Sequence, residues 1–480
     1  MAPLSGTGAL AGVAPVVAAA LLAAITGGLL AERPHLARWL VGIPIVVIAV
    51  VSAAAYPRAA AMVTLAGLPF LGLLRHLFIP ITGLPAFDPL LAVPMIMVAV
   101  VFVRVIVMER RRVTGGTISL LVTVLASLCL LQVINPLGGG IAAGLLSLVS
   151  TLVFLLWFWV GREVLRARDI SRLLWIFVIE ANVIALYGLS QSSNGFLPWD
   201  QAWLDAGGLR SLSVGDALRP FGTFSSASEY VTFLAVGAVA ALGLAISRGR
   251  WSGLLAIPLP VIAVALSGVR STLIAVVVGL IVVGALSTRR PGAAIAAFAT
   301  LVAVVLAAFG LAQPYLAATQ NSTQNALVGH TLSGLLDPWA KNSTGPVHVQ
   351  MVVDGVQAGF AQPLGRGASS VTLAGQKTGT ASSFGNTEFD FSNAFVAFGL
   401  VGGITFLVLA FTTLWRAWRQ ALHRTSAASL AVAGILTCTA GAWWGAAAWA
   451  TAPIFWMLIG SVARSAGEAK AGTNAPGVAA

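Results

Sequence analysis

Long apolar runs, separated by short loops rich in arginine, constrain this sequence more than any other feature. Each run is close to the ~20 residues that cross the hydrocarbon core of a bilayer, and roughly fourteen such runs can be placed along the chain. Only 9% of the residues are charged and 58% are apolar, which leaves too few charges to cover a water-soluble protein of this size. The sequence therefore predicts an all-α, polytopic transmembrane bundle of about 12–14 spans with one large outer loop.

The predicted spans are bounded by charged, glycine-rich or proline-rich breaks. They lie near residues 9–30, 40–56, 59–74, 89–108, 117–134, 141–160, 172–190, 229–247, 251–267, 271–287, 292–312, 393–414, 427–445 and 448–464. The first run lacks a basic leader and an obvious small-residue cleavage site, so we expect a retained helix and not a signal peptide.

Arginine clusters occupy the loops on one side of this succession of helices. They are Arg110 to Arg112, Arg162 to Arg172, Arg248 with Arg250, Arg289 with Arg290, and Arg416 to Arg424. Because basic loops stay in the cytoplasm, both termini are predicted to be cytoplasmic. Arg33, Arg38 and Arg75 depart from the rule.

The same count divides the chain into six parts. These are N-terminal transmembrane helices at 1–190, a first outer loop at 191–228, central transmembrane helices at 229–312, a large outer loop at 313–392, C-terminal transmembrane helices at 393–466, and a cytoplasmic tail at 467–480. The large loop is too long for a simple connection. Inside it, the apolar spacing of residues 347–360 predicts a short helix that lies on the membrane, caps a cavity, or simply packs within the loop.

Several classes of partner and chemistry are not supported. The net charge is +12, but the basic residues flank apolar segments and do not form a patch with interleaved aromatics, so no nucleic-acid partner is expected. Both cysteines, Cys129 and Cys438, fall inside apolar runs and offer no disulfide framework. Phosphate-loop and zinc-binding motifs are absent from the sequence, so no metal or other cofactor is expected.

Two arginines stand apart from the cytoplasmic clusters. Arg219 lies in RPFGTF, at the end of the first outer loop, and Arg270 lies in SGVRST, in a tight turn between two spans. A charge near lipid is costly, and the guanidinium fork binds phosphate while keeping its charge. We therefore expect this pair to bind a diphosphate. The alternative is that each arginine snorkels to the interface or caps helix carbonyls.

Acidic residues introduce the last long apolar segment. In TEFDFSNAFVAFGLVGG, Glu388 and Asp390 precede the span, where a carboxylate could act as general base towards a sugar hydroxyl. Alternatively, both are first-turn acids favoured by the helix dipole. His330 and His348 lie in the same outer loop, but no partner spacing singles them out, and we interpret each as a surface histidine.

Four segments resemble a known family when they are taken in order. They are WIFVIEANVIALYGLSQ at 175–191, RPFGTFSSASEYVTFLAVGAVAALGL at 219–244, SGVRSTLIAVVVGLIV at 267–282, and PLGRG at 363–367 followed by FGLVGG. Over roughly residues 165–410 the chain resembles the O-antigen ligase and polymerase family of bacterial membrane glycosyltransferases. The resemblance implies a GT-C-like bundle.

One departure from the family pattern concerns the catalytic histidine. Family ligases carry a His-Asn motif at the end of the large loop, and here that segment contains no histidine. An ungapped match on Gly399 places Glu388 at the histidine position, whereas a match on the asparagine places Ser392 there. We prefer Glu388, and Asp390 is the reserve candidate.

The resemblance implies transfer of a glycan from a polyprenyl-diphosphate donor to a glycan or glycolipid acceptor. The reaction would take place at the external face of a bacterial plasma membrane, among membrane lipids, without a cofactor. Arg219 and Arg270 would bind the diphosphate, and Arg366 and Asn393 would orient a substrate. The rival interpretations are a transporter or flippase of an anionic or lipid-linked substrate, and a non-catalytic polysaccharide assembly protein.

Overall fold

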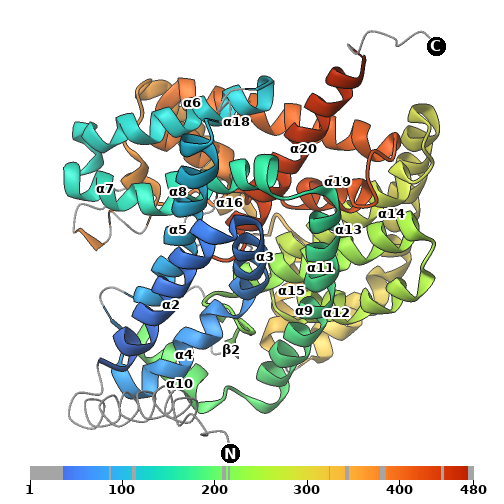
Figure 1. Cartoon of the computed structure of the whole chain (residues 1–480). Coiled ribbons are helices and arrows are strands. Elements are labelled where there is room, and N and C mark those ends of the chain that lie inside the picture. Colours follow the sequence, from blue (N-terminus) through green and yellow to red (C-terminus); the bar gives the residue numbers. More distant parts are fainter. Residues whose placement is uncertain are drawn as a thin grey trace, which may run out of the picture.

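The computed structural model describes residues 36–85, 88–110, 115–207, 212–214, 217–323, 325–340, 345–372, 375, 377–378, 385–444 and 448–473. Helices dominate this part of the chain (Figure 1). The only strands in these ranges form a short antiparallel hairpin, β1 (Ser213–Val214) and β2 (Ala217–Leu218). The predicted all-α class is confirmed.

The helices follow one another with short connections. In chain order they include α2 (Ala37–Ala55), α3 (Pro57–Gly67), α4 (Leu71–Thr82), α5 (Pro89–Phe102), α6 (Thr117–Leu131), α7 (Ile141–Ser150), α8 (Leu152–Trp159), α9 (Ala167–Asn194), α10 (Pro198–Gly207), α11 (Ala227–Arg248), α12 (Pro258–Leu266), α13 (Arg270–Leu286), α14 (Pro291–Ser322), α15 (Ala326–Leu336), α16 (Gly345–Ala361), α18 (Asp390–Leu422), α19 (Ser429–Cys438) and α20 (Ala452–Thr473). In Figure 1, α2 to α5 lie on one side of the bundle and α12 to α14 on the other.

Nine helical segments of the described ranges are long and apolar enough to cross a membrane. They are Ala37–Ala55, Pro57–Thr82, Pro89–Met108, Thr117–Ile134, Ile141–Val164, Ala167–Asn194, Ala227–Arg248, Pro291–Ser322 and Asp390–Leu422. Four further predicted spans coincide with shorter apolar helices, at Trp251–Leu266, Arg270–Leu286, Ser429–Cys438 and Ala452–Arg464. The predicted span at 9–30 lies outside the described residues.

Helix α11 is the most enclosed of these segments. At its N-terminus the side chain of Ser226 accepts a hydrogen bond from the N–H of Glu229 and so caps the helix. At its C-terminus Gly249 adopts the left-handed conformation that ends the helix. Six alanines and two glycines are spread over its 22 residues. Of its most apolar 18 residues, 83% are buried inside the protein. Small residues allow helix backbones to approach closely. At Gly237, for example, a Cβ would overlap Ala181 of α9, so the glycine permits the packing that surrounds α11.

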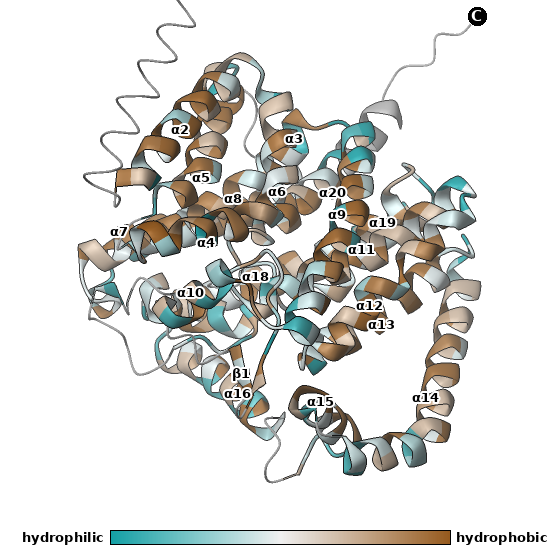
Figure 2. Ribbon diagram, turned by 90° about the horizontal axis from the view of Figure 1, so that it is seen from below, coloured by the Kyte–Doolittle hydropathy of each residue, from teal (hydrophilic) through white to brown (hydrophobic). Residues whose placement is uncertain are grey.

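Helix α14 is the opposite case. It has 32 residues, and only 6% of its most apolar 18 residues are buried inside the protein. It packs on α13 and α15, and Figure 2 shows it at the edge of the bundle, largely hydrophobic along its length. The helix continues to Ser322, past the predicted end of the span near residue 312. Among the described residues of the segment predicted to be the large outer loop are the helices α15 and α16, and α16 confirms the short helix predicted there.

Two of the arginines that depart from the basic-loop rule are buried in ion pairs. Asp88 Oδ2 lies 3.0 Å from Nη1 of Arg38 and 2.7 Å from Nε of Arg75. Asp88 also caps α5 by accepting from the N–H of Leu90 at 3.1 Å. Both arginines pair with the same carboxylate inside the protein and tie α2 and α4 to the start of α5, so internal packing accounts for their departure from the basic-loop rule. Arg33 lies outside the described residues.

Candidate functional site

Arg219 is positioned by the β1–β2 hairpin, which ends immediately before it. Its backbone N–H donates to the carbonyl oxygen of Leu212 at 2.6 Å. Farther along the same segment, the N–H groups of Phe221 and Gly222 donate to Oε1 of Gln191 at 3.1 and 2.8 Å. The RPFGTF segment is therefore fixed on both sides of the proline that follows the arginine.

A buried polar network on α4, α9 and α10 supports this segment from behind. Asp200 accepts from the Tyr187 hydroxyl at 2.6 Å and from Nε2 of Gln191 at 2.9 Å, and its other oxygen lies 3.1 Å from Nδ1 of His76. Asp200 and His76 are fully buried. The Tyr-Gly-x-x-Gln pattern is thus structural, because it anchors the segment that carries Arg219. Nothing in the sequence singled out Asp200 or His76.

Arg270 is the first residue of α13 and follows a tight turn. The turn requires Gly268, whose φ is +78°, and a Cβ at that position would lie 3.6 Å from Nε of Arg219. The two arginine-bearing segments therefore lie side by side, as the pairing predicted from the sequence requires. The Arg270 side chain packs on Gly334 of α15, where a Cβ would overlap the guanidinium.

The electrostatic interactions of these arginines bring in two further side chains. Burial lowers the pKa of Arg219, repulsion from Arg270 lowers it further, and Glu388 raises it. His330 lies on α15, a helix too short to span a membrane, and burial lowers its pKa, with repulsion from both arginines adding to the shift. Guanidinium groups keep their charge under such shifts. The cluster therefore combines two fixed cations, a neutral imidazole and a carboxylate within electrostatic reach.

Glu388 lies on a strained turn that its neighbours hold in place. Its φ is +67°, a conformation that non-glycine residues rarely adopt. The Glu388 N–H donates to Oδ1 of Asn386 at 2.8 Å, and Nδ2 of Asn393 donates to the same oxygen at 2.8 Å. Oδ1 of Asn393 accepts from the N–H and the hydroxyl of Thr387, each at 2.9 Å. Asn393 is buried, and this placement makes it a positioning residue for the turn that presents Glu388.

The partner of Glu388 is a histidine that the sequence analysis interpreted as a surface residue. Nδ1 of His348, in the first turn of α16, lies 2.7 Å from Oε2 of Glu388. The approach is an ion-pair contact without the angle of a well-aligned hydrogen bond. The His348 side chain is partly exposed, as a surface histidine would be, but its contact with Glu388 was not predicted. No spacing rule connects residues so far apart in the chain, and only the fold brings the imidazole to the segment that lacks the family histidine.

Asp390, the reserve candidate, has a different environment. It is buried at the start of α18, and its Oδ2 accepts a hydrogen bond from the backbone N–H of Trp444. Its own N–H donates to the carbonyl oxygen of Gly441 at 3.1 Å. Asp390 thus ties the start of α18 to the segment that follows α19, which is a structural role.

Helix α18 is broken at Gly399, and the break explains two of the family-like segments. Gly399 has φ 67° and ψ −158°. The carbonyl oxygens freed at Val396 and Ala397 accept from the N–H groups of Arg366 and Gly367, at 2.8 and 3.1 Å. The PLGRG segment therefore docks on the FGLVGG segment. The N–H groups of PLGRG provide hydrogen-bond donors for the carbonyl oxygens freed in α18, which would be costly to bury without partners.

The PLGRG segment is also held from the turn between α6 and α7. Nε2 of Gln132 donates to the carbonyl oxygen of Leu364 at 2.8 Å, and Nδ2 of Asn135 donates to that of Gly365 at 2.9 Å. With backbone bonds on both sides, the Arg366 backbone has little freedom. The predicted substrate-orienting arginine is thus mounted on a rigid support.

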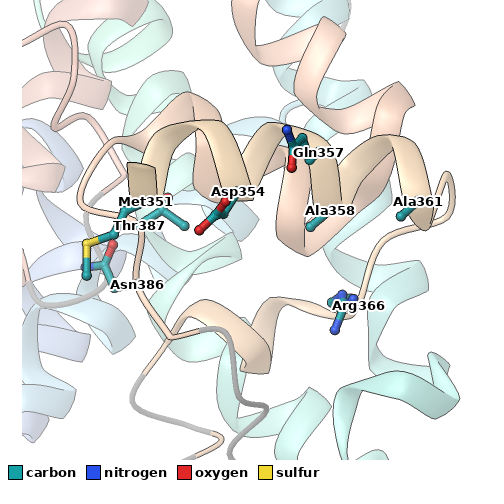
Figure 3. Close-up of a pocket in the computed structure, with 8 residues that line it drawn as sticks. All are labelled: Met351, Asp354, Gln357, Ala358, Ala361, Arg366, Asn386 and Thr387. Carbon is teal, nitrogen blue, oxygen red and sulfur yellow. The ribbon is translucent and has the colours of Figure 1, made fainter. Parts of the chain in front are cut away.

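Arg366 lines a cavity of about 400 Å³ beneath α16 (Figure 3). The lining residues are Met351, Asp354, Gln357, Ala358, Ala361, Arg366, Asn386 and Thr387. Figure 3 shows Arg366 across the space from α16, and Asn386 and Thr387 at one end of it. That end adjoins Glu388 in the chain. Among the interpretations of α16 left open by its sequence, the structure favours a helix that covers a cavity.

Comparisons with protein-family models, with curated proteins and with solved structures find no match for this chain. The class defined by the described helices is therefore a broad one, a multi-pass helical membrane protein. The resemblance to the O-antigen ligase and polymerase family stays a prediction, and the function has to be argued from the site.

Proposed function

We propose that this protein is a membrane glycosyltransferase that moves a glycan from a polyprenyl-diphosphate donor to a glycan or glycolipid acceptor on the outer face of a bacterial plasma membrane. The observation that carries the proposal is the double environment of Glu388, which contacts His348 and lies within electrostatic reach of Arg219. A candidate proton acceptor thus stands beside a candidate anion site.

In this proposal the arginine pair binds the diphosphate of the donor. Arg219 and Arg270 come from segments fixed by backbone bonds and glycine contacts, so little reorganisation is needed when an anion binds. As the bond between the sugar C1 and the diphosphate oxygen breaks, negative charge grows on the leaving group. Two guanidinium groups already in place stabilise that charge, and polyprenyl diphosphate leaves with the bonding electron pair.

The proton of the acceptor hydroxyl goes to the His348–Glu388 pair as the new bond to C1 forms. A carboxylate beside an imidazole fixes the orientation of the ring and stabilises the charge that appears on it, which is the arrangement used by many general bases. The histidine that the family carries at the end of the large loop is, in this proposal, supplied by α16 instead. Asn393 acts by holding the turn that carries Glu388.

Arginine substitution in a purified system tests the proposal. Full-length protein is reconstituted in lipid vesicles with a radiolabelled polyprenyl-diphosphate oligosaccharide and an oligosaccharide acceptor, and the larger product and free lipid diphosphate are measured. We expect Arg219→Gln and Arg270→Gln each to reduce transfer by about 100-fold or more, the scale seen when a preorganised charge stabiliser is lost. Arg289→Gln, in the exposed turn between α13 and α14, is the matched control and should transfer normally. Wild-type transfer by both site variants would refute the proposal.

Transport of the lipid-linked substrate is the second candidate, and the break in α18 favours it, because broken helices form the binding sites of many transporters. In those sites the freed backbone groups face the substrate or ion. Here the carbonyl oxygens of Val396 and Ala397 are already occupied by N–H groups of the PLGRG segment. The same vesicles distinguish the two functions: transport moves the labelled lipid between leaflets without changing its bonds.

A further inference from the structure

One end of the cavity beneath α16 is lined by Asn386 and Thr387, which come immediately before Glu388 in the chain. Met351 follows His348 on α16 by three residues and Asp354 follows Met351 by three, so Met351 is a neighbour of each along the helix surface. Neither His348 nor Glu388 is among the lining residues, but Met351 and Thr387 connect this end of the cavity to them.

The arginine pair does not line this cavity, although it lies near the same carboxylate. The lining contains neither Arg219 nor Arg270, yet the charge of Glu388 acts on Arg219. Glu388 thus adjoins two different environments. One is cationic and suits a diphosphate, and the other is a separate polar hollow.

The polar groups of the hollow are mixed in kind. Asp354 accepts hydrogen bonds, Arg366 donates them, and the amides of Gln357 and Asn386 do both. Nε2 of Gln350 donates to Oδ1 of Asp354 at 2.7 Å and so orients the carboxylate. In Figure 3 the Asp354 side chain lies at the end of the space near Thr387 and Asn386, and Arg366 lies towards the other end.

This combination indicates the chemistry of a ligand. Neighbouring hydroxyls of a sugar offer a donor and an acceptor a short distance apart, which planar carboxylate, amide and guanidinium groups bind two at a time. Asp354 and Arg366 are the two charged residues of the lining and have opposite signs, so the lining carries no net formal charge that would select an anion or a cation. Met351, Ala358 and Ala361 supply apolar contacts for the faces of a ring. The volume is within the range of small-molecule sites, about 300–1,000 Å³.

We propose that the cavity beneath α16 is the acceptor subsite and binds an uncharged sugar unit through Asp354 and Arg366, with the reacting hydroxyl at the end beside His348 and Glu388. This inference rests on the proposed function for its name as acceptor. Its physical content, the binding of a neutral sugar at these residues, does not depend on transfer.

Saturation-transfer NMR on the full-length protein in detergent tests that content without any lipid-linked donor. The probes are the methyl glycosides of glucose, galactose, mannose and arabinose, compared with glucuronate and glucosamine. We expect at least one neutral glycoside to bind, and Asp354→Asn and Arg366→Gln each to weaken that binding by about tenfold or more, since each removes a hydrogen bond to a charged group. Asp337→Asn, an exposed carboxylate of the same loop outside the lining, is the control and should bind as wild type.

The proposal is overturned if no neutral glycoside binds, if a charged sugar binds more tightly than every neutral one, or if binding survives both cavity substitutions. Misfolding of a variant is recognised by its thermal unfolding, and Arg366→Lys, which keeps the charge, should then retain part of the binding. Failure of the vesicle transfer assay together with normal sugar binding would reject the glycosyltransferase and keep the sugar site. The two proposals therefore fail independently.

Discussion

Breaking the His348–Glu388 pair should abolish activity while leaving the fold almost unchanged. At the observed separation of 2.7 Å, the Coulomb attraction of a protonated imidazole and a carboxylate in a water-like dielectric is about 1.5 kcal/mol. The two side chains are 37% and 51% exposed, so solvent screening and side-chain ordering reduce the net stabilisation to about 0–1 kcal/mol. A general base, in contrast, contributes about 10²–10⁴-fold to a rate.

The assay compares His348→Gln, Glu388→Gln and the double variant in two measurements. Thermal unfolding in detergent should differ from wild type by no more than about 1 kcal/mol for each, and transfer in vesicles should fall by about 100-fold or more. Because the two groups act as one unit, the double variant should be no worse than the weaker single variant. The control is Glu109→Gln, which breaks the similarly exposed Arg104–Glu109 pair and should leave transfer unchanged.

Two results would refute this reasoning. If the free energy of unfolding of the single variants is several kcal/mol lower than that of wild type, the pair stabilises the fold despite its exposure. If transfer survives in both, the proton goes elsewhere, and the turn at Glu388 has another purpose.

Two further predictions concern the fold around the site. Gly399→Ala should destabilise the protein by about 2–4 kcal/mol, because alanine is strained at this φ and ψ and its Cβ would overlap the carbonyl oxygen of Pro363; thermal unfolding measures this against Gly292→Ala, where a Cβ meets nothing. His330 should destabilise the protein in acid, because its pKa is lower in the folded state than in the unfolded state. Its contribution to the free energy of unfolding is complete above the ordinary histidine pKa of about 6.5 and is lost as the pH falls below that value. Unfolding of His330→Gln between about pH 5 and 7.5 should therefore depend less on pH than that of wild type, and an unchanged slope would show that His330 does not titrate in this way.

The helices could be predicted because the membrane imposes one strong pattern on the sequence. An apolar run such as the one that becomes α11 has few alternatives to a helix, since its backbone groups must bond to one another in lipid. The end of α14 was harder to place, because Pro314 would ordinarily end or kink a helix, whereas α14 continues through it to Ser322. Helix ends in water depend on local capping, which is a weaker pattern than hydropathy.

The candidate site, too, could be predicted from the sequence only in part. Arg219 and Arg270 could be found because charge near lipid is rare, and the structure places their segments together. His348 could not be found, because its relation to Glu388 is created by the packing of α16 on the start of α18. Arg38 and Arg75 depart from the basic-loop rule for a related reason. Their partner Asp88 is distant enough in the chain that only the fold shows their charges to be internal.

The break at Gly399 has a mechanical consequence for any substrate that enters. Because the PLGRG segment is hydrogen-bonded to the short first part of α18, Arg366 and the turn that carries Glu388 belong to one stiff unit. Because these backbone bonds hold it in place, the unit is a rigid support and does not move aside to admit a glycan. The faces opposite this unit are formed by α15, against which Arg270 packs, and by α16, which covers the cavity.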